Sequence, residues 1–390
     1  MKIKNYMKYC WLASFLFFSC VEKKNVFNGI LLNVPDEETM GQYFLENFEL
    51  EDLVPIETTN EFLLSGIKND VIYYKEKIII ADQVTSSIFV VDAFTGKIET
   101  KICRRGRGPG ESNIILSIAF DEINEKIIVY NDYKKLIFFG LDGSFIKEER
   151  AENFLYDNII YDNGKIIFYD AGKGHGCLPY LISIYDIQDK TWKNIGNDKI
   201  VEFDLRQHGR LLIKSKNIWF APVLDLGLYM LNDDEISVPY MLDKKPLDDN
   251  LRHESVYNPD PFVFIKEVGN RNIMYCVHSI RETEKFIIFK TNKFGFFMLN
   301  KNESKLCWVS LYDERLGIEL WTYYPHNGDD NRIMFVVDAD KWLERTTQNA
   351  DKIPEHLKEK IINIKVNEES NPILVFYKEK YSMEIRYDKQ

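Results

Sequence analysis

Arginine and glycine alternate in one short stretch of the chain, where residues 103–112 read CRRGRGPGES. A guanidinium group binds carboxylate, sulfate or phosphate through paired hydrogen bonds, and glycine lets the backbone approach such an anion closely. The alternative is that the glycines only shape a turn while the arginines pair with acidic neighbours. The stretch does not match the phosphate-binding P-loop, which requires GxxxxGK[ST]. The residues that we expect to contact a ligand here are Arg104, Arg105, Arg107 and Glu111.

Three histidines in other polar loops are candidates for a metal or general-base site, since imidazole binds metals and accepts protons. Their spacing is long and irregular, so solvated loop side chains are the alternative. Aromatic residues near the same predicted face are candidates to stack on sugars, with core packing as the alternative. The histidines are His175, His208 and His253, and the aromatic residues are Phe294, Trp321 and Tyr323.

Catalytic and metal motifs are weak in this chain. The acidic turns do not follow the spacing of a calcium loop, and no G-x-S-x-G nucleophile motif occurs. We therefore predict no cofactor and no metal. The alternative is a hydrolase or lyase with a metal, calcium being the natural choice, in a central channel, where Glu282 and Asn113 are candidates.

The elements that must position these residues repeat along the chain. Short apolar runs follow polar turns, and each of the first five is followed by a second apolar pattern with a polar turn in its middle. Each of the first five units thus predicts four strands joined by hairpins, whereas the sixth lacks an obvious fourth strand. The first runs cover 77–82, 126–132, 165–170, 217–221, 285–290 and 332–338, and the second patterns cover 87–102, 136–149, 180–195, 227–242 and 295–310.

Six such units predict an all-β fold, a six-bladed β-propeller of four-stranded blades occupying residues 41–390. The apolar runs do not alternate with polar residues, as expected for strands covered on both faces, whereas two tandem sandwich domains would show alternation. Residues 48–57 are predicted to close the ring in the last blade, with 381–387 as the other candidate. A small helical insert is predicted over about 340–364, packed over one end of the propeller.

Composition agrees with a β-rich protein. The 390 residues include 26 Phe, 22 Tyr and 6 Trp but only 12 Pro, a mixture that favours strands. The formal net charge of −11 argues against nucleic acid as a partner. We expect a monomer.

The first residues resemble an export signal. Lysines precede an apolar run from Trp11 to Phe18, which is too short to span a bilayer as a helix of about 20 residues. Ser19-Cys20 resembles a lipoprotein cleavage site, so we expect residues 1–19 to be removed, Cys20 to be lipidated and 20–40 to form a tether. The alternative is an ordinary signal peptide with an incidental cysteine. The lipid would be the only membrane contact, on the outer membrane, with the periplasmic or surface face left open.

Four further cysteines lack the CxxC spacing of a zinc or redox site. Burial as small apolar side chains is the expected state, with one or two disulfides as the alternative in an oxidising compartment. These residues are Cys103, Cys177, Cys276 and Cys307.

Four segments together resemble the six-bladed β-propeller lipoproteins of Bacteroidota, a family related in fold to the NHL-repeat propellers. They are 54–59 (VPIETT), 106–111 (GRGPGE), Asp142-Gly143 and 371–380 (NPILVFYKEK). The resemblance covers about residues 45–380 and implies a secreted, lipid-anchored propeller that binds a partner, without a catalytic set to transfer. The predicted function is a module that binds a glycan, peptide or protein through its loop face, with the enzyme and a purely structural role as alternatives.

Overall fold

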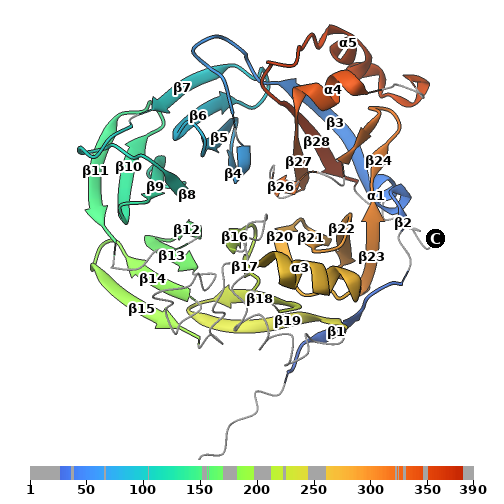
Figure 1. The fold of residues 1–390 in the computed structure, drawn as a ribbon, viewed down its shortest axis with the longest axis horizontal. Helices are drawn as coiled ribbons and strands as arrows, with labels where there is room; N and C mark the ends of the chain where they lie inside the picture. The colour runs from blue at the N-terminus through green and yellow to red at the C-terminus, as the bar shows by residue number, and fades with distance from the viewer. Residues whose placement is uncertain are drawn as a thin grey trace, which may run out of the picture.

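The structure is a ring of six β-sheets around a central axis (Figure 1). This computed structural model describes residues 27–36, 39–65, 67–103, 105–151, 156, 158–169, 182–196, 212–222, 225–244, 261–320, 323, 325–327, 331–345 and 350–380. The predicted six-bladed β-propeller of four-stranded blades is confirmed. Within those ranges, no helix has the length and apolar character needed to cross a bilayer.

Each blade runs from an inner strand at the axis to an outer strand at the rim. Blade 1 contains β4 (Ile67–Tyr74), β5 (Lys77–Asp82), β6 (Ser87–Asp92) and β7 (Ile98–Cys103). Blade 2 contains β8 (Ile115–Asp121), β9 (Lys126–Asn131), β10 (Lys135–Gly140) and β11 (Phe145–Arg150). Blade 3 contains β12 (Asn158–Asp162), β13 (Lys165–Tyr169), β14 (Ile182–Asp186) and β15 (Thr191–Ile195). Blade 4 contains β16 (Leu212–Lys214), β17 (Ile218–Phe220), β18 (Gly227–Asn232) and β19 (Glu235–Asp243). Blade 5 contains β20 (Val277–Glu282), β21 (Phe286–Thr291), β22 (Phe296–Asn300) and β23 (Lys305–Ser310). Blade 6 contains β26 (Pro325–Asn327), β27 (Arg332–Val337), β28 (Ile373–Glu379) and β3 (Phe48–Pro55). A short hairpin of β24 (Tyr312–Asp313) and β25 (Ile318–Glu319) lies between blades 5 and 6.

The middle strands are buried on both faces because every blade is packed between two others. In β5, Ile79 belongs to an apolar cluster shared with blade 2, whereas Ile80 belongs to a cluster shared with blade 6. The outer strands β11 and β15 have one blade edge free and contain many exposed or half-buried residues. This arrangement explains the apolar runs without alternation.

Aspartates at strand ends shape the tight turns. Asp92 Oδ1 accepts hydrogen bonds from Phe94 N (3.1 Å) and Thr95 N (2.8 Å), at the turn between β6 and β7. Asp121 and Asp186 accept equivalent bonds from the backbone two and three residues later. Such Asx turns are encoded locally, which is why the hairpins were visible in the sequence.

The ring is closed by the N-terminal strand, as predicted. β3 is the outermost strand of blade 6 and pairs antiparallel with β28, with Pro55 opposite Ile373 and Phe48 opposite Glu379. The first and last parts of the fold are therefore held in one sheet. The competing candidate, residues 381–387, lies outside the described residues.

Part of the segment expected to be a tether belongs to the ring. β1 (Ile30–Asn33) pairs parallel with β19 at the rim of blade 4, and β2 (Thr39–Met40) pairs parallel with β23 at the rim of blade 5. The chain thus follows the outside of the ring before it enters blade 6. The predicted tether does not continue to residue 40 as a free segment, because these exposed sheet edges offer it backbone partners.

The helical insert lies between β27 and β28 as predicted and contains α4 (Ala339–Glu344), a 3₁₀ turn (Ala350–Lys352) and α5 (Glu355–Asn363). Its position corrects the prediction, because Figure 1 shows it outside the rim beside β3 rather than over an end of the channel. Leu357 and Ile361, four residues apart, face the same core cluster as Leu53 of β3. The insert covers the outer edge of the last blade.

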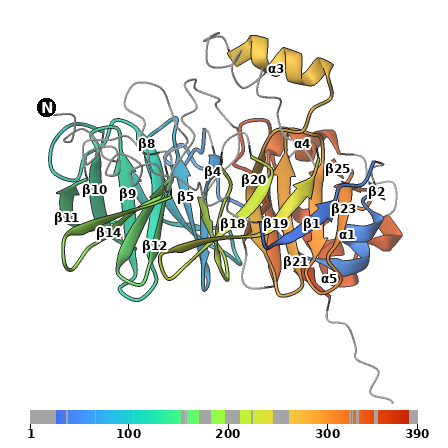
Figure 2. The ribbon, with the colours of Figure 1, turned by 90° about the horizontal axis from the view of Figure 1, so that it is seen from below.

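Two helices in the described part of the chain were not predicted. α1 (Gln42–Asn47) is only six residues long and joins β2 to β3. α3 (Pro261–Asn270) lies on the connection from blade 4 to blade 5 and stands above one end of the ring (Figure 2). We call that end the α3 face. Because strands alternate in direction, the links between blades and the turns between second and third strands lie on this face.

Two of the four cysteines expected to be buried are described with their side chains, and both are buried free thiols. They are Cys276 and Cys307. Burial raises the pKa of the Cys276 thiol to about 12, so this side chain acts as a small apolar group.

Candidate functional site

The arginine-rich loop connects β7 of blade 1 to β8 of blade 2 and lies on the α3 face. Arg105 is exposed, and its Nη2 donates a hydrogen bond to the carbonyl oxygen of Val84 (2.8 Å) in the β5–β6 turn. Arg107 is exposed as well. Its Nε donates to Tyr133 Oη (3.2 Å), and its guanidinium lies 5.9 Å from the centre of the Tyr133 ring.

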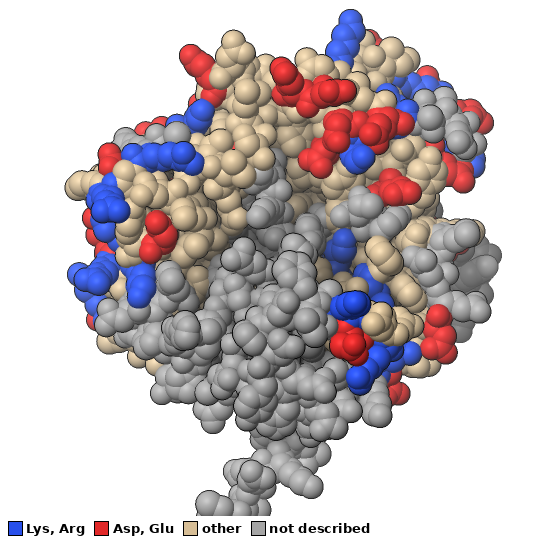
Figure 3. Space-filling view, in the orientation of Figure 1, with Lys and Arg blue, Asp and Glu red and all other residues tan. Residues whose placement is uncertain are grey.

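Neither of these two guanidinium groups forms an ion pair with any described carboxylate. Their recorded contacts are with neutral groups, the Val84 carbonyl and the Tyr133 hydroxyl and ring. An arginine that is exposed yet positioned by neutral contacts keeps its charge available to an anion. Figure 3 shows the surrounding face, where basic side chains gather over the left rim and beside α3, and acidic ones gather over the upper right.

Two carboxylates hold the backbone of this loop. Glu111 Oε2 accepts a hydrogen bond from Gly108 N (2.8 Å), and Glu148 Oε2 accepts one from Gly110 N (3.0 Å). Lys135 pairs with Glu148 at 2.8 Å and, with the Gly110 amide, holds the pKa of that carboxyl below its usual range. The amides of Gly108 and Gly110 therefore have partners already.

Glycine is required in the loop where it meets Glu111. Gly106 has a φ of 152°, and a Cβ atom there would lie 1.9 Å from Glu111 Oε2. Glu111 was expected beside the ligand, but its Oε2 is directed to the loop's own backbone. The glycines shape a turn here, whereas Arg107 contacts Tyr133 and no acidic side chain of the described residues.

Several predicted site residues lie outside the described residues, and the predictions on them remain predictions. They are Cys20, Arg104, His175, His208, His253 and Trp321. The related aromatic candidates are described: Phe294 is 77% exposed on the β21–β22 loop of the α3 face, and Tyr323 is half-buried.

The residues named for the enzymatic alternative have structural partners. Glu282 is buried and accepts hydrogen bonds from Trp219 Nε1 (2.8 Å) and Asn217 of blade 4, and it pairs with Lys301 at 2.9 Å. It thereby joins blades 4 and 5. Asn113 donates a hydrogen bond to Tyr133 Oη. Across the described ranges, no three His, Cys, Asp or Glu side chains come together as metal ligands.

The first two strands of blade 5 carry buried polar groups that the sequence did not single out as site residues. His278 of β20 lies directly opposite Lys290 of β21, and both are less than 10% exposed. Burial lowers the pKa of Lys290 to about 8, and its ammonium group donates to the carbonyl oxygen of Tyr323 (3.2 Å). The neighbouring Ser279 has a φ of 53° at a bulge in β20. Lys290 is the last residue of an apolar run in the sequence. A lysine at that position is usually solvated, and no neighbouring residue indicates that this one is buried.

A second candidate site is a pocket of about 350 Å³ between blades 6 and 1. It was missed because its residues come from β3, β4, β27, α5, β28 and a turn. Asp52 and Lys360, which pair in it, are 308 positions apart in the sequence. The lining residues are Glu51, Asp52, Tyr73, Ala93, Phe94, Arg332, His356, Leu357, Lys360 and Phe376.

Fold and surface define this protein as a six-bladed β-propeller that is closed by its N-terminal strand and presents an arginine loop on one face. The chain belongs to the family of the domain of unknown function DUF4934, which it matches over residues 43–378. No curated protein sequence matches it.

Two solved structures share this fold. A protein from Bacteroides fragilis NCTC 9343, whose description proposes that it is exported, is 17% identical, with a TM-score of 0.70, over 90% of this chain and 100% of that one. A member of the duf4221 family from Bacteroides vulgatus ATCC 8482 is 10% identical, with a TM-score of 0.52, over 86% of this chain and 99% of that one. At these identities the likeness concerns the fold alone.

Proposed function

We propose that this protein is a non-catalytic binding module outside the cytoplasm that holds an acidic ligand on its α3 face. The observation that carries the proposal is the pair of exposed guanidinium groups, Arg105 and Arg107, which no described carboxylate neutralises. Around them, the carboxylates of Glu111 and Glu148 are used to hold the loop backbone. A ligand carboxylate, sulfate or phosphate would supply the missing counter-charge.

Arginine suits this role because its planar group binds an oxyanion through two parallel hydrogen bonds. The contacts with Val84 and Tyr133 position both side chains before a ligand arrives, which reduces the entropy lost on binding. The overall acidity of the chain works against non-specific attraction of anions. An acidic partner must therefore be recognised locally, by the arginine loop.

The binding experiment is a calorimetric titration of the purified chain with three ligand sets: uronate or sulfated oligosaccharides, acidic peptides, and neutral oligosaccharides. We expect one acidic set to bind and the double variant R105A/R107A to weaken it at least about tenfold. The matched control is R150A/K365A, which removes two exposed positive charges from β11 and from the segment after α5. Equal weakening by both double variants, or none by either, would overturn the arginine-loop site.

Calcium separates this function from the enzymatic alternative. The same titrations are repeated with calcium and with chelator. Ligand binding that is indifferent to both supports the non-catalytic module. Calcium-dependent binding with turnover of the oligosaccharide would replace it with a metal-dependent hydrolase or lyase.

The proposed location is the outer membrane, with lipidated Cys20 as the anchor. The basic and apolar first residues and the Ser19-Cys20 pair support this, as does the proposed export of the Bacteroides fragilis neighbour. We also propose that this protein is related in fold to the NHL-repeat propellers, as the resemblance to the lipoprotein family implies. In cells fed labelled palmitate, the native chain should be labelled and found with membranes, and C20S should lose the label. A labelled C20S would contradict lipidation at this residue.

A further inference from the structure

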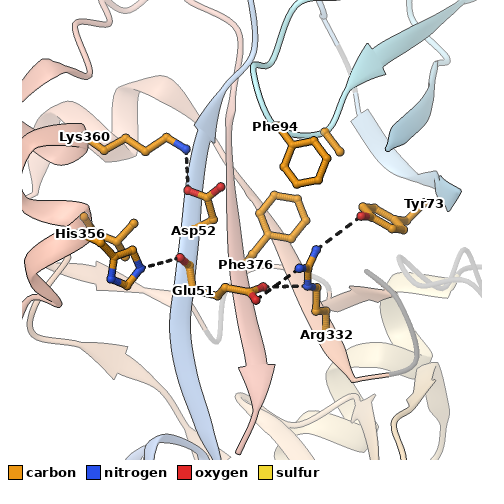
Figure 4. A pocket seen from close by; sticks show the side chains of 10 residues that line it. Glu51, Asp52, Tyr73, Phe94, Arg332, His356, Lys360 and Phe376 are labelled. Carbon is orange, nitrogen blue, oxygen red and sulfur yellow. Dashed lines mark hydrogen bonds and ion pairs between the residues drawn. The ribbon is translucent and has the colours of Figure 1, made fainter. Parts of the chain in front are cut away.

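The pocket between blades 6 and 1 lies away from the arginine loop. By strand alternation, β4 ends, β27 begins and β6 turns into β7 at the end of the ring opposite the α3 face. Tyr73, Arg332 and Phe94 come from these three places. The outer side of the pocket is formed by α5 and β3, as Figure 4 shows.

Aromatic side chains form one wall of the pocket. Phe94 is 50% exposed at the tip of the β6–β7 turn, and Phe376 of β28 lines the pocket from the sheet. Tyr73 packs edge-on against Phe376, with ring centres 6.4 Å apart. Figure 4 shows Phe94 and Phe376 on the same side of Arg332. Phe94 offers most of this apolar surface to a ligand, because Phe376 is only 3% exposed.

Charged side chains line the other wall, and they are paired with one another. Arg332 Nε lies 2.7 Å from Glu51 Oε2, and Lys360 Nζ lies 2.6 Å from Asp52 Oδ1. Two acids and two bases leave no net charge among these four lining side chains, and Lys378, which does not line the pocket, lies 3.5 Å from Glu51 Oε1. A charged ligand would have to separate one of these ion pairs, whereas hydroxyl groups can bond to the remaining lone pairs and N–H groups.

A histidine at the rim adds a hydrogen-bonding group of defined orientation. His356 Nε2 lies 3.1 Å from the carbonyl oxygen of Glu51. A carbonyl only accepts, so Nε2 carries the proton, and in the neutral ring Nδ1 is then an acceptor.

The turn that carries Phe94 is fixed to blade 6. Gly96 has a φ of 72°, and a Cβ there would lie 1.9 Å from the carbonyl oxygen of Pro55. Glu57 N donates to Gly96 O at 2.8 Å, and Asp92 accepts from Phe94 N and Thr95 N. The exposed ring is therefore held over the pocket in advance of binding.

We propose that this pocket binds a sugar residue of a neutral glycan. An aromatic wall matches the apolar face of a pyranose ring, and the paired charges opposite it match the ring's hydroxyl groups. The volume of about 350 Å³ is at the lower end of the range for small-molecule sites. A pocket of this size suits a single sugar ring and parts of the adjoining sugars. The site is separate from the acidic ligand of the α3 face.

The test is a titration of the purified chain with neutral oligosaccharides built from glucose, mannose, galactose or xylose. We expect one series to bind and Phe94→Ala to weaken it about tenfold or more. The matched control is Tyr312→Ala, which removes another exposed aromatic ring, from the β24–β25 hairpin. R105A/R107A should leave neutral binding unchanged, so this proposal and the acidic-ligand proposal fail separately.

Three outcomes would overturn the proposal. One is that no neutral oligosaccharide binds the native chain at millimolar concentration. Another is that Tyr312→Ala weakens binding while Phe94→Ala does not. The third is that a charged sugar binds in a Phe94-dependent manner more tightly than its neutral counterpart. Unchanged melting temperatures of both variants establish that loss of folding is not the cause.

Discussion

Blade 1 is flanked by two junctions that use charge in opposite ways. At the junction with blade 2, carboxylates of Glu111 and Glu148 bind the loop backbone. Arg105 and Arg107 have no acidic partner among the described residues. At the junction with blade 6, the acidic and basic side chains pair with each other around a cavity. The two junctions contain similar numbers of charged residues, but these residues have different partners. The pairing of charges, rather than their count, therefore predicts the ligand class.

The two junctions also differ in what holds their turns. Gly96 approaches the Pro55 carbonyl, which belongs to the backbone of β3, whereas Gly106 approaches the side chain of Glu111. A backbone atom cannot move without disturbing the sheet, but a glutamate can change its rotamer. Substitution of Gly96 in the β6–β7 turn should therefore destabilise the protein more than substitution of Gly106 in the arginine loop.

The largest predicted effect follows from this difference. Gly96→Ala should lower the free energy of unfolding by about 3 kcal/mol or more, because strain at positive φ adds to a backbone clash. Gly106→Ala should lower it by about 1 kcal/mol. Urea denaturation of the two variants measures both values. Equal losses would show that the rigidity of the two turns is the same.

Salt should separate the two sites next. Acidic-ligand binding at Arg105 and Arg107 should weaken at least about threefold between 0.05 and 0.5 M NaCl, since exposed charges are screened. Neutral-glycan binding at the Phe94 pocket should change by less than about twofold, because the ligand carries no charge. Calorimetry at the two salt concentrations tests this. A salt-sensitive neutral ligand would contradict the paired-charge interpretation of the pocket.

Acid should loosen both turns through their carboxylates. The pKa of Asp92 is lowered chiefly by its hydrogen bonds with Thr95, and the pKa of Glu148 chiefly by Lys135. A depressed folded-state pKa means that the unfolded chain binds more protons, so the stabilisation is present above the unfolded pKa values of about 4 and is lost as pH falls through the lower folded values.

The corresponding variants are Asp92→Asn and Glu148→Gln. Each should be less stable than the native chain at pH 7, and the difference should shrink as pH falls below about 4. Urea midpoints measured across this range test it for each turn. A difference that stays constant with pH would mean that the carboxylate charge does not hold the turn.

The smallest effect is expected for an ion pair at the pocket rim. Lys360 and Asp52 are about a third exposed, so Lys360→Met should change the free energy of unfolding by less than about 1 kcal/mol. The variant leaves Asp52 without its partner and makes the pocket negative. Binding of a cationic amino sugar should then improve relative to its neutral counterpart. No change in that preference would weaken the argument from charge balance.

Much of the fold was predictable because its signals are local. The run at 77–82 and the turn at Asp92 each form from neighbouring residues, so hairpins and blade number follow from short segments. Closure by β3 was predictable as well, since the last unit lacked a fourth strand. The short helix α1 and the rim position of the insert were missed, because packing against distant strands decided both.

By itself, the sequence determined the class of fold, the order of blades and the exposed arginine loop of residues 105–111, all set by neighbouring residues. Only the tertiary structure decided which charges are neutralised. Glu111 accepts a hydrogen bond from the backbone of its own loop, and Arg107 donates one to Tyr133. Lys360 pairs with Asp52, which is 308 positions away in the sequence. Hydrogen bonds and ion pairs depend on distances of a few ångströms, and those distances are fixed only when the ring closes and brings separate blades together.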